Sequence, residues 1–325
     1  MRKVAVTDYT FPSLDVEAAI LEPLGCEIAA LRERRPPSEL VPLVADAEAV
    51  LTQFAPVNAE VVAAMGRARV IVRYGVGVDN VDLEAARAKG IPVCNVPDYC
   101  IDEVADHALA FILAATRNVE PNSRGVKAGN WKLAVPLAAM RALKGLAVGV
   151  VGCGRIGREV IRRLLPFKAR LLAFDPVLPP AEVQALGAEP VSFERLLAES
   201  DVVTLHCPST PRTRRMMNGD AFGRMKPAAL LVNLARGDLV DTAALVEALR
   251  SGRLGGAALD VCDPEPIPPD HPLLRMDNVV LASHVASASV QAARTLRETA
   301  ALTVARALRG EPLTNVVNGV TGPAA

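Results

Sequence analysis

Apolar runs of a few residues alternate with amphipathic stretches along nearly the whole chain, a pattern typical of an α/β protein with buried parallel strands. Before residue 100 the apolar runs predict strands at 3–7, 26–31, 49–51, 70–72 and 92–95. Helical stretches lie between them, at 15–24 and at 58–65, where Asn58 is placed to cap the helix. These segments predict a small α/β unit that is complete in itself.

The alternation resumes after a long apolar helix predicted at 101–117 and a looser stretch at 118–141 that holds the only tryptophan. Further apolar runs predict strands at 146–151, 171–174, 202–205, 230–234, 257–261 and 279–282. A last helix is expected at 287–309, and the tail after it is too short for a domain, so we expect it to return to the first unit. We therefore predict a discontinuous domain, 1–98 with 287–325, and a second domain at 99–286.

Composition and charge narrow the class of protein. A chain of 325 residues with 51% apolar and 22% charged residues suits a folded protein of two domains. Lys plus Arg equals Asp plus Glu at 36 each, so bulk charge favours neither nucleic acid nor an anionic membrane as a partner. No apolar run approaches a membrane span, and the first residues are typical of a strand rather than a signal peptide. The six cysteines form no C-x-x-C pair, which indicates reduced thiols in the cytoplasm and no metal site.

The strand at 146–151 leads into a glycine motif that opens a helical stretch, Gly152-Cys153-Gly154-Arg155-Ile156-Gly157. The next strand ends in Asp175, about twenty residues beyond the glycines. In a dinucleotide-binding βαβ unit, Gly152 permits the turn, Gly154 lets the backbone approach a pyrophosphate, and Gly157 lets the helix pack on the strand. The pattern therefore predicts a Rossmann-type doubly wound parallel sheet that binds a dinucleotide.

Asp175 also indicates which dinucleotide binds. A carboxylate at this position accepts hydrogen bonds from the ribose hydroxyls and repels a 2′-phosphate. The residue after it is Pro176, not an arginine that could pair with such a phosphate. We expect NAD rather than NADP as the cofactor. His206 ends the strand at 202–205, and we expect it to line the same site.

Three polar groups follow neighbouring strands of the predicted sheet, whose carboxyl ends meet at one edge. Arg236 follows the strand at 230–234, Glu265 lies in the loop after 257–261, and His284 follows 279–282. Histidine suits the exchange of a hydroxyl proton, and a carboxylate beside it favours the imidazolium and orients the ring. A guanidinium can grip a carboxylate and polarise the neighbouring carbonyl. This trio predicts hydride transfer between nicotinamide and a 2-hydroxy acid or its 2-keto acid.

In these residues and motifs the chain resembles the D-isomer-specific 2-hydroxyacid dehydrogenase family. This family includes phosphoglycerate dehydrogenases, glyoxylate and hydroxypyruvate reductases and the C-terminal-binding-protein corepressors. The matching segments span nearly the whole chain in the family's order: 73–82, the glycine motif, 233–237, Asp260 with Glu265-Pro266, and His284. The resemblance implies a flavodoxin-like substrate domain built from both chain ends, and a homodimer formed by the nucleotide domain.

The resemblance also implies roles for individual residues. Arg236, Glu265 and His284 would be catalytic, with His284 as the acid/base. The backbone near Val76 and Gly77 would hold the substrate carboxylate. Besides the glycines, the NAD contacts would be Arg155, Ile156, Asp175, Cys207, Thr213, Leu234, Ala235, Arg236, Asp260 and His284. Tyr74 lies near the expected substrate site, and we predict that it contributes to substrate binding.

Some segments depart from particular branches of the family. Where phosphoglycerate-specific members carry an Arg-Ser pair, residues 51–56 contain no cation, which argues against phosphoglycerate. Formate dehydrogenases have glutamine where Glu265 stands, which argues against formate. The segments 53–56 and 96–100 look closer to bacterial relatives of the corepressor branch. An NAD(H)-sensing binding protein with residual activity is therefore the alternative, and an oxidoreductase acting on an inorganic oxyanion such as phosphite is a third hypothesis.

Overall fold

The computed structural model describes residues 1–321 and divides into two compact units. Unit 1 contains Met1–Cys100 and the chain from Ala288 onward, and unit 2 contains Ile101–Ser287. The last four residues of the predicted range 287–325 lie outside the described part. Within that part, no helix is both long enough and apolar enough to span a bilayer.

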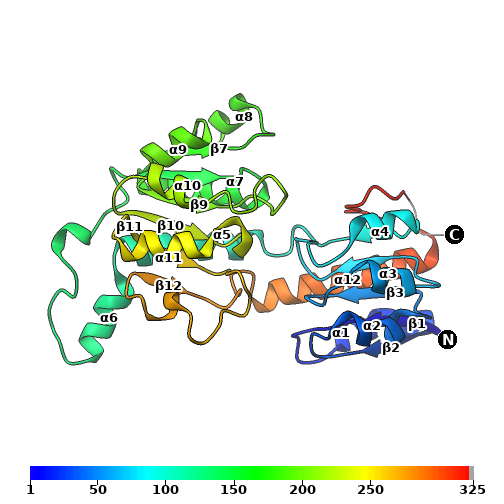
Figure 1. Cartoon of the computed structure of the whole chain (residues 1–325). Helices are drawn as coiled ribbons and strands as arrows, with labels where there is room; N and C mark the ends of the chain where they lie inside the picture. Colours follow the sequence, from blue (N-terminus) through cyan, green and yellow to red (C-terminus); the bar gives the residue numbers. More distant parts are fainter. Residues whose placement is uncertain (322–325) are drawn as a thin grey trace. The chain divides into compact units, whose positions relative to one another are not determined.

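Unit 1 is built on a five-stranded parallel sheet in the order β2-β1-β3-β4-β5, which is the flavodoxin-like order (Figure 1). Its strands are β1 (Arg2–Val6), β2 (Cys26–Ala30), β3 (Ala49–Thr52), β4 (Ile71–Arg73) and β5 (Val93–Cys94). Its helices are α1 (Asp15–Leu21), α2 (Pro37–Val44), α3 (Ala59–Ala64), α4 (Leu83–Ala88) and α12 (Val290–Arg309). The tail joins this unit, since Val316 pairs with Cys94 and Val317 donates to Val93.

The strands of unit 1 are apolar on both sides because helices cover both faces. On one face Val4, Val6 and Leu51 pack with residues of α12. The alternate residues Ala5 and Val50 pack on the other face against α2 and α3. The near-continuous apolar runs of the sequence are therefore explained by two hydrophobic cores, one on each face.

Unit 2 carries a seven-stranded parallel sheet in the order β12-β11-β10-β9-β6-β7-β8, a doubly wound Rossmann-type sheet. Its strands are β6 (Ala147–Val151), β7 (Arg170–Phe174), β8 (Glu189–Pro190), β9 (Val202–Leu205), β10 (Ala229–Asn233), β11 (Leu254–Leu259) and β12 (Val279–Leu281). Its helices are α5 (Ile101–Thr116), α6 (Val119–Lys127), α7 (Arg155–Leu164), α8 (Pro180–Ala185), α9 (Phe193–Glu199), α10 (Gly219–Arg224) and α11 (Thr242–Arg250).

Short 3₁₀ turns complete the element list: η1 (Glu22–Leu24), η2 (Leu137–Ala139), η3 (Leu165–Phe167), η4 (Gly237–Leu239) and η5 (Pro272–Arg275). The helix predicted at 15–24 is α helical only to Leu21, because Pro23 cannot donate to the helix and the chain tightens into η1. The cap predicted at Asn58 is confirmed, since its side chain accepts from the Val61 amide at 3.1 Å.

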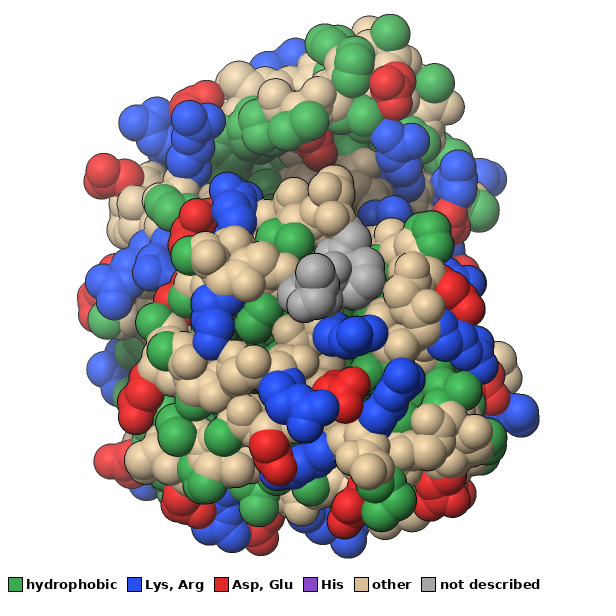
Figure 2. Space-filling view, turned by 90° about the vertical axis from the view of Figure 1, so that its right-hand side faces the viewer, with side chains coloured by type: hydrophobic (Ala, Val, Ile, Leu, Met, Phe, Trp, Pro, Cys, Tyr) green, Lys and Arg blue, Asp and Glu red, His purple; other side chains and the backbone are tan. Residues whose placement is uncertain are grey.

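Two other expectations are corrected by the structure. The stretch at 118–141 begins with a regular helix, α6, which has no buried residue. Its large apolar side chains are Val119 and Val126, too few for the apolar stripe that would have predicted a helix. The last helix begins at Val290 rather than at 287, because the Ser289 side chain accepts from the Ala292 amide and caps it there. Figure 2 shows acidic and basic side chains interspersed over the face that it presents, in keeping with the balanced charge.

Candidate active site

The glycine motif forms the turn between β6 and α7, and two of its glycines have no room for a side chain. A Cβ on Gly157 would lie 2.0 Å from the Gly152 carbonyl oxygen. A Cβ on Gly152, which has a φ of +93°, would lie 2.8 Å from the Cys207 amide nitrogen. Gly154, at the N-cap of α7, faces open space instead. The motif is therefore tightly packed at Gly152 and Gly157 and open at Gly154, which leaves room for a ligand to approach the backbone there.

Asp175 follows β7 and is tied to this turn. One carboxylate oxygen accepts from the Cys153 amide at 2.8 Å, and the other accepts from the amides of Val177 and Leu178. Burial raises the pKa of the Asp175 carboxyl, but these amides and the charge of Arg158 outweigh it, so the pKa lies below its usual value. A charged carboxylate thus stands beside the glycine turn.

His206, Cys207 and Thr213 lie in the segment after β9. The His206 ring shares a hydrogen bond of 2.9 Å with the Thr204 hydroxyl. Burial lowers the pKa of His206 to about 4, so this ring is neutral at pH 7. Burial raises the pKa of the Cys207 thiol to about 11. The Thr213 hydroxyl donates to the Pro208 carbonyl and accepts from the Thr210 amide, which closes the turn.

The predicted catalytic residues follow β10, β11 and β12, which are neighbours in the sheet. His284 Nδ1 lies 2.9 Å from Glu265 Oε2, and the other Glu265 oxygen accepts from the Cys262 amide at 3.1 Å. Burial raises the pKa of Glu265, but the hydrogen bond and charge of His284, the Cys262 amide and the charge of Arg236 together bring the pKa below its usual value. The pair therefore joins an ionised carboxylate to the imidazole of His284.

Arg236 lies in a tightly packed turn beside the loop that carries Glu265. A Cβ on Gly237 would lie 1.9 Å from the Cys262 carbonyl oxygen, so the turn after β10 lies directly against the Glu265 loop. Asn233, fully buried at the end of β10, accepts from the Ala235 amide and donates to the Arg236 carbonyl. The Arg236 guanidinium donates to the Ala235 carbonyl at 2.7 Å.

His284 is itself held by Asp260, a buried residue beyond β11. The Asp260 oxygens accept from the amides of Val285 and Ala286, and its carbonyl accepts from the His284 amide. His284 takes a left-handed conformation with a φ of +56°, which is uncommon for a residue other than glycine. These three bonds to one residue hold the turn in that conformation.

The residues expected to bind a substrate carboxylate lie in unit 1, in the loop after β4. The Val76 carbonyl accepts from the Asn95 side chain at 2.6 Å, and the Gly75 carbonyl accepts from the Val96 amide. Tyr74 is different: its side chain is 1% exposed, and its hydroxyl donates to the buried Glu17. Its phenol belongs to the core of unit 1, so the predicted contribution of Tyr74 to substrate binding is left to its backbone.

Sequence reasoning missed Asn95, and it included Asn233 only as part of the matching segment 233–237, without its role in holding a loop. Each follows or ends a strand and binds backbone atoms of a functional loop. An asparagine at the carboxyl end of a parallel strand is a usable signal, because that is where ligand-binding loops begin.

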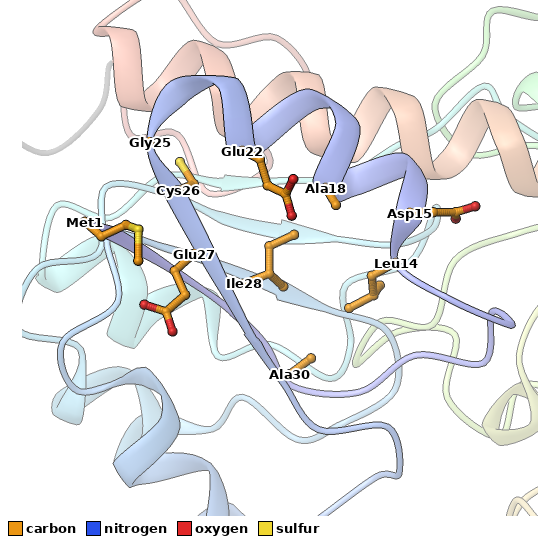
Figure 3. Close-up of a pocket in the computed structure, with 10 residues that line it drawn as sticks. All are labelled: Met1, Leu14, Asp15, Ala18, Glu22, Gly25, Cys26, Glu27, Ile28 and Ala30. Carbon is orange, nitrogen blue, oxygen red and sulfur yellow. The ribbon is translucent and has the colours of Figure 1, made fainter.

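An open groove of about 640 Å³ runs along α1 and β2 in unit 1, and none of the predicted site residues is among those that line it. Figure 3 shows its carboxylates, Asp15, Glu22 and Glu27, on separate elements around it. Among the described residues no group of His, Cys, Asp and Glu is placed to hold a metal ion.

The family described as "D-isomer specific 2-hydroxyacid dehydrogenase, NAD binding domain" matches residues 109–286. The chain is 40% identical to a glyoxylate reductase of Korarchaeum cryptofilum over 90% of both chains. It is 39% identical to a D-3-phosphoglycerate dehydrogenase of Archaeoglobus fulgidus, but spans only 53% of that relative's length. A crystal structure of D-lactate dehydrogenase from Aquifex aeolicus, complexed with NAD and lactic acid, superposes with a TM-score of 0.83 at 29% identity, covering 95% of this chain and 96% of that one.

Proposed function

The chain belongs to the D-isomer-specific 2-hydroxyacid dehydrogenase family, and from this premise we propose how its own residues perform the reaction. The protein is an NAD-dependent oxidoreductase that interconverts a small D-2-hydroxy acid and its 2-keto acid by hydride transfer. Its relatives are dehydrogenases and reductases, which favours an enzyme over an NAD(H)-sensing binding protein. The observation that carries the proposal is the contact between His284 and Glu265, with Arg236 in the adjoining turn.

The glycine turn fits NAD, because it is open above Gly154 and has a charged Asp175 beside it. We propose that Gly152, Gly154 and Gly157 admit the pyrophosphate and that Asp175 binds the adenosine ribose. The other coenzyme contacts would come from the start of α7, the turn after β9, the ends of β10 and β11, and His284: Arg155, Ile156, His206, Cys207, Thr213, Leu234, Ala235, Arg236, Asp260 and His284. When bound, NADH supplies a hydride to the keto carbon, and NAD⁺ accepts it in the reverse direction.

The protein supplies the proton and the alignment. Since Nδ1 of His284 faces Glu265, proton exchange with the substrate oxygen falls to Nε2. Glu265 stays ionised and favours the imidazolium, which donates to the keto oxygen during reduction and receives the proton back during oxidation. The Arg236 guanidinium would bind the substrate carboxylate and polarise the keto group, with the backbone amides at Val76 and Gly77 holding the carboxylate.

We propose a small 2-keto acid without a second anionic group as the substrate, because residues 51–56 contain no Lys or Arg to pair with one. The test is a panel of glyoxylate, pyruvate, hydroxypyruvate and phosphohydroxypyruvate, followed by the absorbance of NADH. Turnover of the small acids, with phosphohydroxypyruvate at least about tenfold poorer in kcat/KM, is the expected result. A preference for phosphohydroxypyruvate would contradict the substrate class, and no turnover of any member would contradict the function.

A homodimer formed by unit 2 is the proposed assembly. Its support is a set of exposed apolar side chains in and after α6, among them Trp131, which is 89% exposed: Val119, Val126, Trp131, Leu133 and Leu137. Light scattering tests the dimer, and Trp131→Asp is expected to yield a monomer.

We also propose the cytoplasm as the location, with the six cysteines as free thiols as they are in the structure.

A further inference from the structure

The backbone of Cys153, in the middle of the glycine motif, is held from two sides. Its amide donates to Asp175 at 2.8 Å, and its carbonyl accepts from Nε of Arg158 at 3.0 Å. The second bond comes from the first turn of α7, the helix that the motif opens. The guanidinium of Arg158 also donates to Glu182 in α8 at 3.2 Å. Arg158 therefore links the glycine turn to the helix that follows Asp175.

The bond to the Cys153 carbonyl has a consequence for the next amide. The Cys153 carbonyl and the Gly154 amide belong to one planar, trans peptide unit, so they point in opposite directions. Fixing the carbonyl therefore fixes the direction of the Gly154 N–H. Gly154 is the N-cap of α7, where the amides have no partner within the helix and the helix dipole favours an anion.

We propose that Arg158 is a positioning residue for the coenzyme, which orients the Gly154 amide toward a phosphate oxygen by holding the Cys153 carbonyl. The inference rests on the NAD site of the proposed function. Arg158 does not contact the coenzyme in this account and acts through the backbone. Glu182 supports it by holding the second arm of the guanidinium.

The test compares Arg158→Met, which keeps the apolar stem, with Arg162→Met as a matched control one turn later on α7. Arg162 pairs only with Glu159 among the contacts that the structure shows, and its side chain is 59% exposed. Binding is measured by titration with three probes that require no turnover: NADH, ADP-ribose and adenosine. ADP-ribose keeps the pyrophosphate without the nicotinamide, and adenosine lacks the pyrophosphate.

Arg158→Met is expected to raise the Kd of NADH and of ADP-ribose by the same factor, about five- to tenfold, and to leave that of adenosine unchanged. Arg162→Met should change none of them by more than about twofold. Glu182→Gln should give a smaller loss that disappears in the Arg158→Met background.

Three results would overturn the proposal. Unchanged binding in Arg158→Met would show that the Gly154 amide needs no such support. An equal loss for adenosine would mean that the whole nucleotide site had deformed, and a loss for NADH alone would place the effect at the nicotinamide. Because these probes bind without chemistry, a wild-type protein that binds NADH but reduces no keto acid would refute the proposed reaction and not this inference.

Discussion

At the scale of single residues, the proposed chemistry depends on charges that the surroundings set. Glu265 is kept ionised by His284, the Cys262 amide and Arg236, although its partial burial acts in the opposite direction. His206, the other histidine near the glycine turn, is kept neutral by burial, and its ring contacts the Thr204 hydroxyl and no carboxylate within residues 1–321. Two histidines of the same unit thus differ in role because only one faces a carboxylate.

Glu265→Gln tests whether the carboxylate that faces His284 is needed for its role in the reaction. The variant retains the shape but loses the charge that favours the imidazolium, so kcat for keto-acid reduction should fall about a hundredfold. In the wild-type protein the lowered pKa keeps Glu265 charged as pH falls, so reduction should not weaken between about pH 7 and pH 5.

The exposed Glu247 on α11 provides the control, and Glu247→Gln should match the wild-type rate and profile. A Glu265→Gln variant that keeps more than about a tenth of the wild-type kcat would mean that the carboxylate is not required for proton transfer by His284.

At the scale of elements, the strands were predictable and several loops and side-chain directions were not. Each strand of unit 2 from β9 to β12 lies within a few residues of its apolar run. Burial on both faces demands such a run in the central strands β9 and β10, whereas the edge strand β12 is half-buried. The edge strand β8 has only Glu189 and Pro190 and leaves no apolar signal. The burial of Tyr74 depends on packing with Phe11, which lies far away in the sequence.

The candidate site was also only partly predictable from the sequence. The positions of Arg236, Glu265 and His284 after three strands were visible in the sequence, because strand order decides which loops meet. The bonds from Asn95, Asp260 and Arg158 were not visible, since they depend on how each loop turns. Motifs therefore located the reacting groups, whereas the residues that hold them required the structure.

Gly237→Ala tests whether the packing of two turns assembles the site. The added Cβ would collide with the Cys262 backbone carbonyl, which cannot move without displacing the Glu265 loop. We expect a loss of about 3 kcal/mol in unfolding free energy and at least about a tenfold loss in kcat. Gly223→Ala is the control, because nothing lies within 4 Å of a Cβ there, and it should be neutral or slightly stabilising. Denaturant unfolding and keto-acid reduction measure both effects.

At the scale of the whole chain, a buried ion pair joins the two ends of the sequence within unit 1. Arg297 on α12 donates to Glu17 on α1 at 2.7 Å, and Glu17 also accepts from Tyr74. Glu17 is completely buried, and the Arg297 guanidinium lies over the Phe11 ring. The network connects the C-terminal helix to the residue that precedes the loop of Val76 and Gly77.

Arg297→Met should therefore destabilise the protein strongly, by about 3–5 kcal/mol, because it leaves a buried carboxylate without its cation. Arg294→Met, one turn earlier on α12, breaks only an exposed pair with Glu298 and should cost less than about 1 kcal/mol. Equal unfolding free energies for the two variants, measured in denaturant, would contradict a structural role for the buried pair.

The most direct test of the central claim is the rate of NADH oxidation by a small 2-keto acid in wild-type protein and in His284→Asn, both saturated with NADH. If His284 supplies the proton, kcat falls about a thousandfold while the Kd of NADH changes by less than about threefold. A variant that keeps more than about a tenth of the wild-type kcat would contradict the account.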